Sequence, residues 1–310
     1  MKRIPIWIDT DTGVDDSIAI LCALKTPELD IVGMSAVSGN VELVHTFRNA
    51  RDVVSFGGRE DIKVYKGADK PLIKDAFYAH HVHGANGIGD AVIPSSNAPV
   101  EIEAAWDALY KKACELDGEL TVVAVGPLTN IAIAIAKYPD FVSRIKQIAI
   151  MGGAMQGGNI TCCAEFNIWA DPHAAQNVFR SGAKIIMCGL DVTLKGVLYM
   201  NEIEEIGTYN NPQSKYFIDA TPGSIKINES IVKGYVPHDL CPMWYLAYPE
   251  MFTADIANVY VETCSEITLG KTVTDYWNGD GKLPKNDVTV VMDVDREKFA
   301  NKIKEIFKNY

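Results

Sequence analysis

Near its start the chain reads Ile4-Pro5-Ile6-Trp7-Ile8-Asp9-Thr10-Asp11-Thr12-Gly13-Val14-Asp15-Asp16, and this stretch decides the fold. The apolar run that ends at Asp9 has the composition of a buried β-strand, and a helical pattern follows over Asp16–Lys25. In open α/β sheets, ligands bind outside the carboxyl ends of the strands. The acidic stretch Asp9–Asp16 is therefore predicted to lie at the edge of a binding site.

Strand and helix patterns alternate along the chain as far as Leu190. Besides Ile4–Asp9, the candidate strands are Ile31–Val37, Ile62–Tyr65, Thr121–Val125, Gln147–Met151 and Lys184–Leu190. The helical patterns after Asp16–Lys25 are Val41–Phe56, Ile102–Leu116, Leu128–Lys137 and Pro172–Arg180. Buried strands separated by helices predict an α/β fold in which a mostly parallel central sheet carries helices on both faces, as a Rossmann-like open sheet.

The pattern is less regular after about residue 195. Helices are expected at Asn201–Thr208, Asp239–Tyr248 and Arg296–Lys308, and strands at Tyr260–Leu269 and Asp287–Asp293. The polar stretch Tyr209–Lys233 is the best candidate for a mobile loop. Because no repeat or proline-rich linker marks a boundary, we expect a single domain over residues 1–310.

Composition narrows the possible partners and the location. The net charge of -11 comes without long basic runs, so a nucleic-acid partner is not expected. A run of about 18 apolar residues does not occur, which argues against a membrane span. Asp9 and Asp11 interrupt the first apolar stretch too early for a signal peptide. The odd number of cysteines, 7, fits a reducing compartment, and we expect a cytoplasmic protein.

The carboxylates of Asp9, Asp11, Asp15 and Asp16 crowd a short piece of chain. Helix capping would explain one or two of them but not the whole cluster. Like charges at this spacing raise one another's pKa values, and a bound cation is the simplest way to keep them ionised. Oxygen ligands without a nearby cysteine or histidine favour Ca²⁺ or Mg²⁺ over Zn²⁺.

With the residues Ser17-Ile18-Ala19 that follow it, this stretch resembles the D-x-D-x-G-x-D-D-[AS]-x-A signature of the calcium-dependent, inosine-uridine preferring nucleoside hydrolases. Further stretches are similar to that family in the same order: Val37-Ser38-Gly39-Asn40, His83-Gly84-Ala85-Asn86-Gly87, Val125-Gly126-Pro127-Leu128-Thr129-Asn130, Met151-Gly152-Gly153, Asn159, Ala164-Glu165-Phe166-Asn167, Asp171-Pro172 and His238-Asp239. The resemblance extends from residue 4 to at least residue 239. Thr12 and Val125 depart from the family, which often has proline and threonine there.

The resemblance implies hydrolysis of the N-glycosidic bond of a ribonucleoside, giving ribose and a free base, a reaction of purine and pyrimidine salvage. Calcium would be held by the carboxylates of Asp11, Asp16 and Asp239 and by the carbonyl of Val125. The calcium-bound water would attack C1′, with Asp11 as the base that takes its proton and His238 as the acid that assists the leaving group. The resemblance also implies a homodimer or homotetramer.

The same resemblance assigns residues to the substrate. Those implied to contact the ribose or the base are Asp15, Asn40, His83, Met151, Asn159, Glu165, Asn167 and Asp239. A side chain of Cys162 or Cys163 facing the pocket and burial of both cysteines in the core remain open alternatives. Stacking on the base by aromatic residues of the segment 209–237 is a weak signal, because loop aromatics commonly pack locally. Base preference is expected to depend on loops near residues 75–90 and 209–238.

Two other interpretations compete with this one. Asp9-Thr10-Asp11 after an apolar strand also resembles the D-x-D motif of haloacid-dehalogenase-type phosphatases, but that family has threonine or valine where Gly13 stands and does not require Asp15-Asp16. The second is a nucleoside- or sugar-binding protein without turnover. Binding alone would require neither Asp11 as a base nor His238 as an acid, so their presence favours an enzyme.

Overall fold

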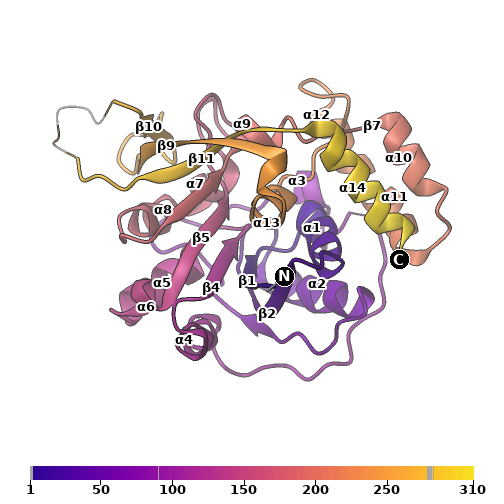
Figure 1. Cartoon of the computed structure of the whole chain (residues 1–310), viewed down its shortest axis with the longest axis horizontal. Coiled ribbons are helices and arrows are strands. Elements are labelled where there is room, and N and C mark those ends of the chain that lie inside the picture. Colours follow the sequence, from indigo (N-terminus) through magenta and orange to yellow (C-terminus); the bar gives the residue numbers. More distant parts are fainter. Residues whose placement is uncertain (1–2, 90, 278–280, 282) are drawn as a thin grey trace.

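The centre of the molecule is a sheet of nine strands in the order β10-β9-β11-β6-β5-β4-β1-β2-β3 (Figure 1). The computed structural model describes residues 3–89, 91–277, 281 and 283–310. Neighbours from β11 to β3 are parallel, whereas β9 is antiparallel to both β11 and β10. The predicted mostly parallel α/β sheet is confirmed. The strands are β1 (Ile4–Thr10), β2 (Leu29–Ala36), β3 (Val64–Lys66), β4 (Leu120–Ala124), β5 (Ile145–Met151), β6 (Ile185–Cys188), β9 (Phe252–Val261), β10 (Thr272–Asp275) and β11 (Val288–Val294).

Helices cover both faces of this sheet, as alternation along the strands requires. In β1, Ile6 and Ile8 point into one hydrophobic core and Trp7 points into the other. The first core is covered by α1 (Val14–Leu24), α2 (Leu43–Phe56), α10 (Met200–Gly207), α11 (Pro212–Ala220), α13 (Leu240–Ala247) and α14 (Arg296–Lys308). The second core is covered by α4 (Ala105–Leu116), α5 (Thr129–Lys137), α6 (Phe141–Arg144) and α8 (Pro172–Phe179).

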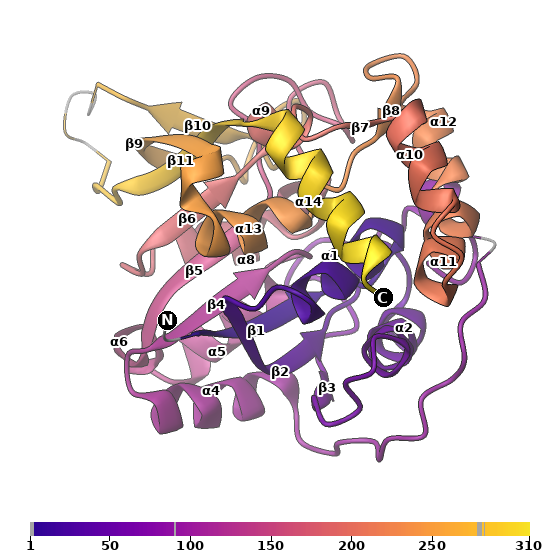
Figure 2. The same cartoon turned by 45° about the vertical axis from the view of Figure 1, so that its right-hand side comes forward.

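Short elements complete the chain near the carboxyl ends of the strands and after β6. They are α3 (His80–His83), α7 (Phe166–Ala170), α9 (Leu190–Thr193), α12 (Pro222–Asn228), the 3-10 turn Pro249–Met251, and a two-stranded sheet of β7 (Leu198–Tyr199) and β8 (Gly234–Tyr235). In Figures 1 and 2 the last helix, α14, lies beside the first helix, α1, so the two ends of the chain share one core.

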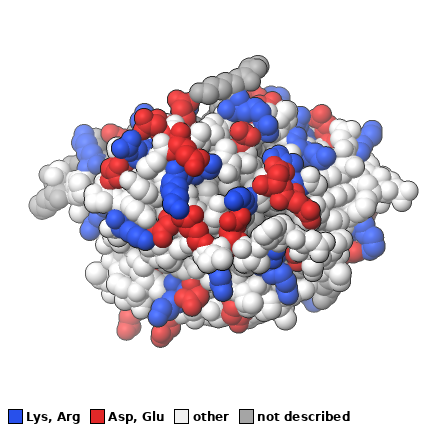
Figure 3. All heavy atoms as spheres, turned by 90° about the horizontal axis from the view of Figure 1, so that it is seen from below, with Lys and Arg blue, Asp and Glu red and all other residues white. Residues whose placement is uncertain are grey.

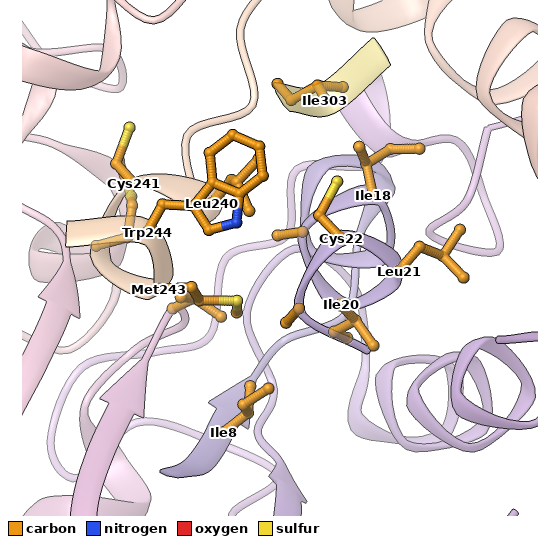
Figure 4. Close-up of a cluster of buried hydrophobic side chains, with 14 of the residues drawn as sticks. Ile8, Ile18, Ile20, Leu21, Cys22, Leu240, Cys241, Met243, Trp244 and Ile303 are labelled. Carbon is orange, nitrogen blue, oxygen red and sulfur yellow. The ribbon is translucent and has the colours of Figure 1, made fainter. Parts of the chain in front are cut away.

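The contact between α1 and α13 matters most for the site (Figure 4). Cys22 of α1 lies toward Trp244 of α13, whereas Leu21 points to the opposite side of α1, and all three residues are fully buried. Each large apolar side chain buried in this way stabilises the fold by roughly 1.5–3 kcal/mol. The helices are thereby fixed relative to each other, with the residues at their N-terminal ends at the same edge of the sheet.

Two predictions about the C-terminal part of the chain were wrong. The expected strand Tyr260–Leu269 is replaced by β9, which ends at Val261, and by β10, which begins at Thr272. The first half of β9 is largely exposed, so its apolar pattern is too weak to be recognised. The expected mobile loop Tyr209–Lys233 contains α11 and α12, each with a proline in its first turn.

Charged side chains of both signs are interspersed on the face drawn in Figure 3. This arrangement agrees with a soluble surface in which acidic and basic groups neutralise one another locally. Among the described residues, we find no helix with the length and apolar character needed to cross a membrane.

Candidate active site

Three carboxylates from distant parts of the sequence meet at the carboxyl end of β1. Asp15 and Asp16 belong to the first turn of α1, and Asp239 immediately precedes α13. One carboxylate oxygen from each lies within 4.8 Å of the others, close enough for all three to hold one metal ion. The packing of α1 against α13 brings Asp239 to the other two, because each helix starts at this point.

Asp11 lies directly behind this group and is fully buried. Its Oδ2 accepts a hydrogen bond from the backbone N–H of Asn40 at 2.7 Å, and its Oδ1 is buried without a hydrogen-bond partner among the described residues. Asp16 is held by Thr10 Oγ1, by the N–H of Gly13 at 2.8 Å and by Asn40 Nδ2 at 3.1 Å. Asn40 therefore fixes two carboxylates at once.

The acidic cluster is electrostatically unfavourable by itself. Burial, followed by the charge of Asp16, raises the pKa of Asp11 well above its ordinary value. Burial and the neighbouring Asp16 raise the pKa of Asp15 to about 7, and burial and Asp15 raise the pKa of Asp239. A bound cation would offset the repulsion between these carboxylates and would give the unpartnered oxygen of Asp11 a partner. This set of oxygen donors fits a hard divalent ion such as Ca²⁺ or Mg²⁺.

Two glycines allow the chain to pass this closely around the cluster. A Cβ on Gly13 would lie 2.5 Å from His83 Nδ1 and 2.6 Å from Asn40 Nδ2, closer than Cβ atoms normally approach. A Cβ on Gly39 would overlap the carboxylate of Asp11 and the ring of Pro127. The backbone at both positions can therefore approach the site only as glycine.

A cavity of about 300 Å³ opens in front of the carboxylates. Ten of the residues assigned by the family resemblance line it: Asp15, Asn40, His83, Val125, Met151, Asn159, Glu165, Asn167, His238 and Asp239. Asp11 and Asp16 are fully buried and do not line it. Segments as far apart in the sequence as Asp15 and Asp239 thus contribute to one pocket.

One wall of the cavity is a rigid polar layer built by α7. Glu165 caps α7, and its carboxylate accepts hydrogen bonds from the backbone N–H groups of Gly153, Asn167 and Ile168. Asn167 Nδ2 donates to the carbonyls of Val125 at 3.0 Å and Met151 at 3.1 Å, which lie at the ends of adjacent strands. The carbonyl of Val125, a predicted metal ligand, is thus held by an amide in this structure. Both oxygens of Glu165 are likewise engaged within the protein.

Besides His81, the histidines His83 and His238 line the same cavity. Burial lowers the pKa of His83 to about 3 and that of His238 to about 4, so both rings are neutral near pH 7. His83 Nδ1 accepts the backbone N–H of Val14 at 3.1 Å, which places the proton of its neutral ring on Nε2. His238 Nδ1 lies 2.8 Å from Thr193 Oγ1.

The structure also shows wall residues that the sequence analysis missed. One side of the cavity is formed by α12 and the residues after it, through Ser224, Ile227, Asn228 and Ile231, with His81 and Val82 of α3 next to them. Pro222, in the first turn of α12, was the local sequence signal from which this helix could have been predicted. The two segments expected to determine base preference, near residues 75–90 and 209–238, therefore both contribute residues to the cavity lining. Residue 90 lies outside the described residues.

The aromatic residues Tyr216, Phe217 and Tyr235 and the adjacent free cysteines Cys162 and Cys163 lie outside the cavity lining. Tyr216, Phe217 and Tyr235 are buried in the core, and they do not line the cavity. Their suggested role in stacking on the base is not supported. Cys162 is exposed, and Cys163 Sγ donates to the carbonyl of Ile267 at 3.5 Å, so neither faces the pocket as described.

Comparison with known proteins identifies the family of this chain. The family model of the inosine-uridine preferring nucleoside hydrolases matches residues 6–301. The chain belongs to this family. It is an enzyme that cleaves the N-glycosidic bond of nucleosides. The two alternative interpretations, a phosphatase and a binding protein without turnover, are therefore excluded.

Individual nucleoside hydrolases match over their full length. The chain is 37% identical over 310 residues to the pyrimidine-specific ribonucleoside hydrolase RihA of Escherichia coli, covering 99% of each. The plant nucleoside hydrolase PpNRh1 superposes with a TM-score of 0.94 at 33% identity, covering 100% of both chains. The purine-preferring ribonucleoside hydrolase from Gardnerella vaginalis gives a TM-score of 0.91 at 34% identity, covering 99% of this chain and 100% of that one.

Proposed function

We propose that this nucleoside hydrolase is calcium-dependent and releases ribose and a free base, with Asp11 as the base that activates water and His238 as the group that assists the leaving base. The proposal is carried by one observation. Three carboxylates, Asp15, Asp16 and Asp239, converge beside a cavity of about 300 Å³ that Asp15, Asp239 and His238 line.

The acidic cluster would hold Ca²⁺ through the carboxylates of Asp11, Asp16 and Asp239 and the carbonyl of Val125. The unpartnered Oδ1 of Asp11 and the oxygen-only donor set support this assignment. Asp15, assigned to the ribose hydroxyls by resemblance, also lies within ligand distance of Asp16 and Asp239. A bound Ca²⁺ would supply Lewis acidity, lowering the pKa of a coordinated water and orienting the hydroxyls of the ribose.

Cleavage of an N-glycosidic bond passes through a ribosyl cation with oxocarbenium character. The carboxylate of Asp11 would remove the proton from the water that attacks C1′. The backbone N–H of Asn40 donates to Oδ2 of Asp11 and so sets the orientation of this carboxylate. The polar layer of Asn159, Glu165 and Asn167 would position the sugar, and Oδ1 of Asn159 is held by the N–H of Phe166.

The leaving base gains electron density as the bond to C1′ breaks. His238 and His83 border the same cavity and would donate hydrogen bonds to the base from neutral rings. Withdrawal of charge from the base in this way lowers the barrier to its departure. The wall of Ser224, Ile227 and Asn228 would select among bases by shape and hydrogen bonding.

The direct test is release of ribose from inosine, adenosine, guanosine, uridine and cytidine, with added Ca²⁺ and again after chelation. Calcium-dependent release is expected, and the ranking of the five substrates gives the base preference. The names of the relatives include both pyrimidine-specific and purine-preferring enzymes, so the panel covers both classes. Unchanged turnover after chelation, followed by dialysis, would contradict the calcium assignment but not the reaction.

The assignment of His238 is tested by the choice of leaving group. The substitution His238→Ala should lower kcat/KM for natural ribonucleosides by about 10²-fold or more, and much less for 4-nitrophenyl riboside, whose leaving group needs no donor. His45→Ala, at a histidine that does not line the cavity, serves as the control. Equal losses on both substrates would count against the leaving-group role.

A further inference from the structure

The side chain of Thr193, which does not line the cavity, contacts His238, the histidine proposed to assist the leaving base. Thr193, the last residue of α9, is fully buried. Its Oγ1 lies 2.8 Å from Nδ1 of His238, which is 45 residues further along the chain. His238 itself stands on the cavity wall, immediately before Asp239. The hydroxyl therefore occupies one ring nitrogen and leaves Nε2 for a ligand in the cavity.

The direction of this hydrogen bond follows from the partners available to each group. The hydroxyl of Thr193 has one proton to donate, and His238 Nδ1 is its hydrogen-bond partner among the described residues. If Nδ1 carried the ring proton, the buried hydroxyl would have to turn its own proton away from its acceptor. A buried donor without an acceptor costs the free energy of a lost hydrogen bond. Donation from Oγ1 to Nδ1 satisfies both groups.

We propose that Thr193 is a positioning residue: its hydroxyl donates to His238 Nδ1 and so keeps the ring proton on Nε2, where it can be donated to the leaving base. This inference rests on the proposed function of His238. A carboxylate at this position would favour a charged imidazolium ring, whereas a hydroxyl supports the neutral ring and sets its tautomer and orientation.

Nδ1 of His83, which also lines the cavity, is occupied as well, but by a backbone donor. The backbone N–H of Val14 donates to Nδ1 of His83, and a backbone amide can only donate. Both rings are thereby left with an N–H at Nε2, a donor suited to negative charge developing on a departing base. The backbone sets the tautomer of His83, but a single replaceable side chain sets that of His238.

The first test reads the tautomer without substrate. The parent protein, labelled with ¹⁵N-histidine, is studied by NMR at about pH 8, above the ordinary histidine pKa, and the signals of His238 are assigned with His238→Gln. We expect a single neutral tautomer of His238 protonated at Nε2. A ring protonated at Nδ1, or an even mixture, would overturn the proposal. Because no turnover is required, this outcome is independent of the proposed function.

The second test compares Thr193→Val with Thr193→Ser. The valine variant should show both tautomers of His238, should leave the signals of His83 unchanged, and should lower kcat/KM for the best ribonucleoside about tenfold. For 4-nitrophenyl riboside the loss should be below about twofold. Serine retains the hydroxyl and should restore the single tautomer and most of the turnover.

A matched control separates positioning from general loss of structure. Thr26 is also buried, and its hydroxyl donates to the carbonyl of Cys22 and accepts from Trp244, away from the cavity. Thr26→Val should destabilise the fold without changing the ratio of activities on the two substrates. If Thr193→Val lowered both activities equally, as a structural defect would, the positioning role would be rejected.

Discussion

The backbone N–H of Asn40 donates to Oδ2 of Asp11 at 2.7 Å, while Oδ1 of the same carboxylate is buried and has no hydrogen-bond partner in the described part of the chain. Asn40 follows β2 and Asp11 follows β1, so this bond joins the ends of two adjacent parallel strands. The contact gives the proposed base a fixed orientation before any substrate arrives, which is the preorganisation that catalysis by a positioned group requires.

Replacement of Asp11 by asparagine should remove most of the turnover while preserving the fold. We expect kcat to fall by about 10³-fold, because the amide cannot take a proton from water. The metal-free variant should unfold at the same temperature as the parent or higher, since one of the mutually repelling acids is gone. Ribose release and thermal unfolding measure the two effects. Asp61→Asn, at an exposed acid paired with Arg59, is the control, and comparable rates for the two variants would refute the role of Asp11.

The close approach of Gly39 to Asp11 leads to a second prediction. Alanine at this position should displace the Asp11 carboxylate, because the added Cβ overlaps it and Pro127. We expect about a 10²-fold loss of kcat/KM, as small displacements of a catalytic group are costly. Gly207→Ala in α10, where the new Cβ meets only Ile218 at ordinary contact distance, should leave the rate unchanged. Steady-state kinetics on both variants decide the point, and full activity in Gly39→Ala would contradict the geometry.

Replacement of Asp239 should abolish most of the stabilisation of the fold by Ca²⁺. A ligand that binds only the folded state stabilises it by about 2.7 kcal/mol at one hundred times its dissociation constant. Ca²⁺ should therefore raise the unfolding temperature of the parent, and the rise should largely disappear in Asp239→Asn. Differential scanning calorimetry with and without Ca²⁺ measures this shift, with Asp61→Asn again as the control. A shift of parental size in Asp239→Asn would exclude this carboxylate as a ligand.

The buried His83 predicts a pH dependence of stability. Burial lowers the pKa of His83 to about 3. Below the ordinary histidine pKa of about 6.5, the unfolded chain therefore binds a proton at this residue that the folded protein does not bind. The contribution of His83 is therefore fully present above pH 6.5 and is lost progressively as the pH falls toward 3. Between pH 7 and pH 5 the loss should reach about 2 kcal/mol.

Urea unfolding of the chelated protein at several pH values tests this effect. His83→Asn should show a smaller loss of unfolding free energy than the parent between pH 7 and pH 5, because asparagine does not titrate. His81→Asn, at an exposed neighbouring histidine, provides the comparison. Identical pH profiles for His83→Asn and the parent would show that the ring is not held neutral.

The regular N-terminal elements were predicted well because their signals are local. The strand ending at Asp9 and the terminal helix Arg296–Lys308 have a periodicity that any short window reveals. By contrast, β9 is exposed over much of its first half, and α11 and α12 are short and polar. Such elements are stabilised by tertiary packing, so the sequence window around them contains too little information.

By itself, the sequence determined the alternating α/β pattern, the acidic stretch at the end of the first strand, and the glycine at position 13 that the turn requires. These features depend on residues close together in the chain. The tertiary structure alone decided that Asp239 joins Asp15 and Asp16, that α12 forms a wall of the cavity, and that Thr193 contacts His238. The physical reason is that burial of the faces of α1 and α13 against each other, which depends on the whole core, sets the distances between residues more than 200 positions apart in the chain.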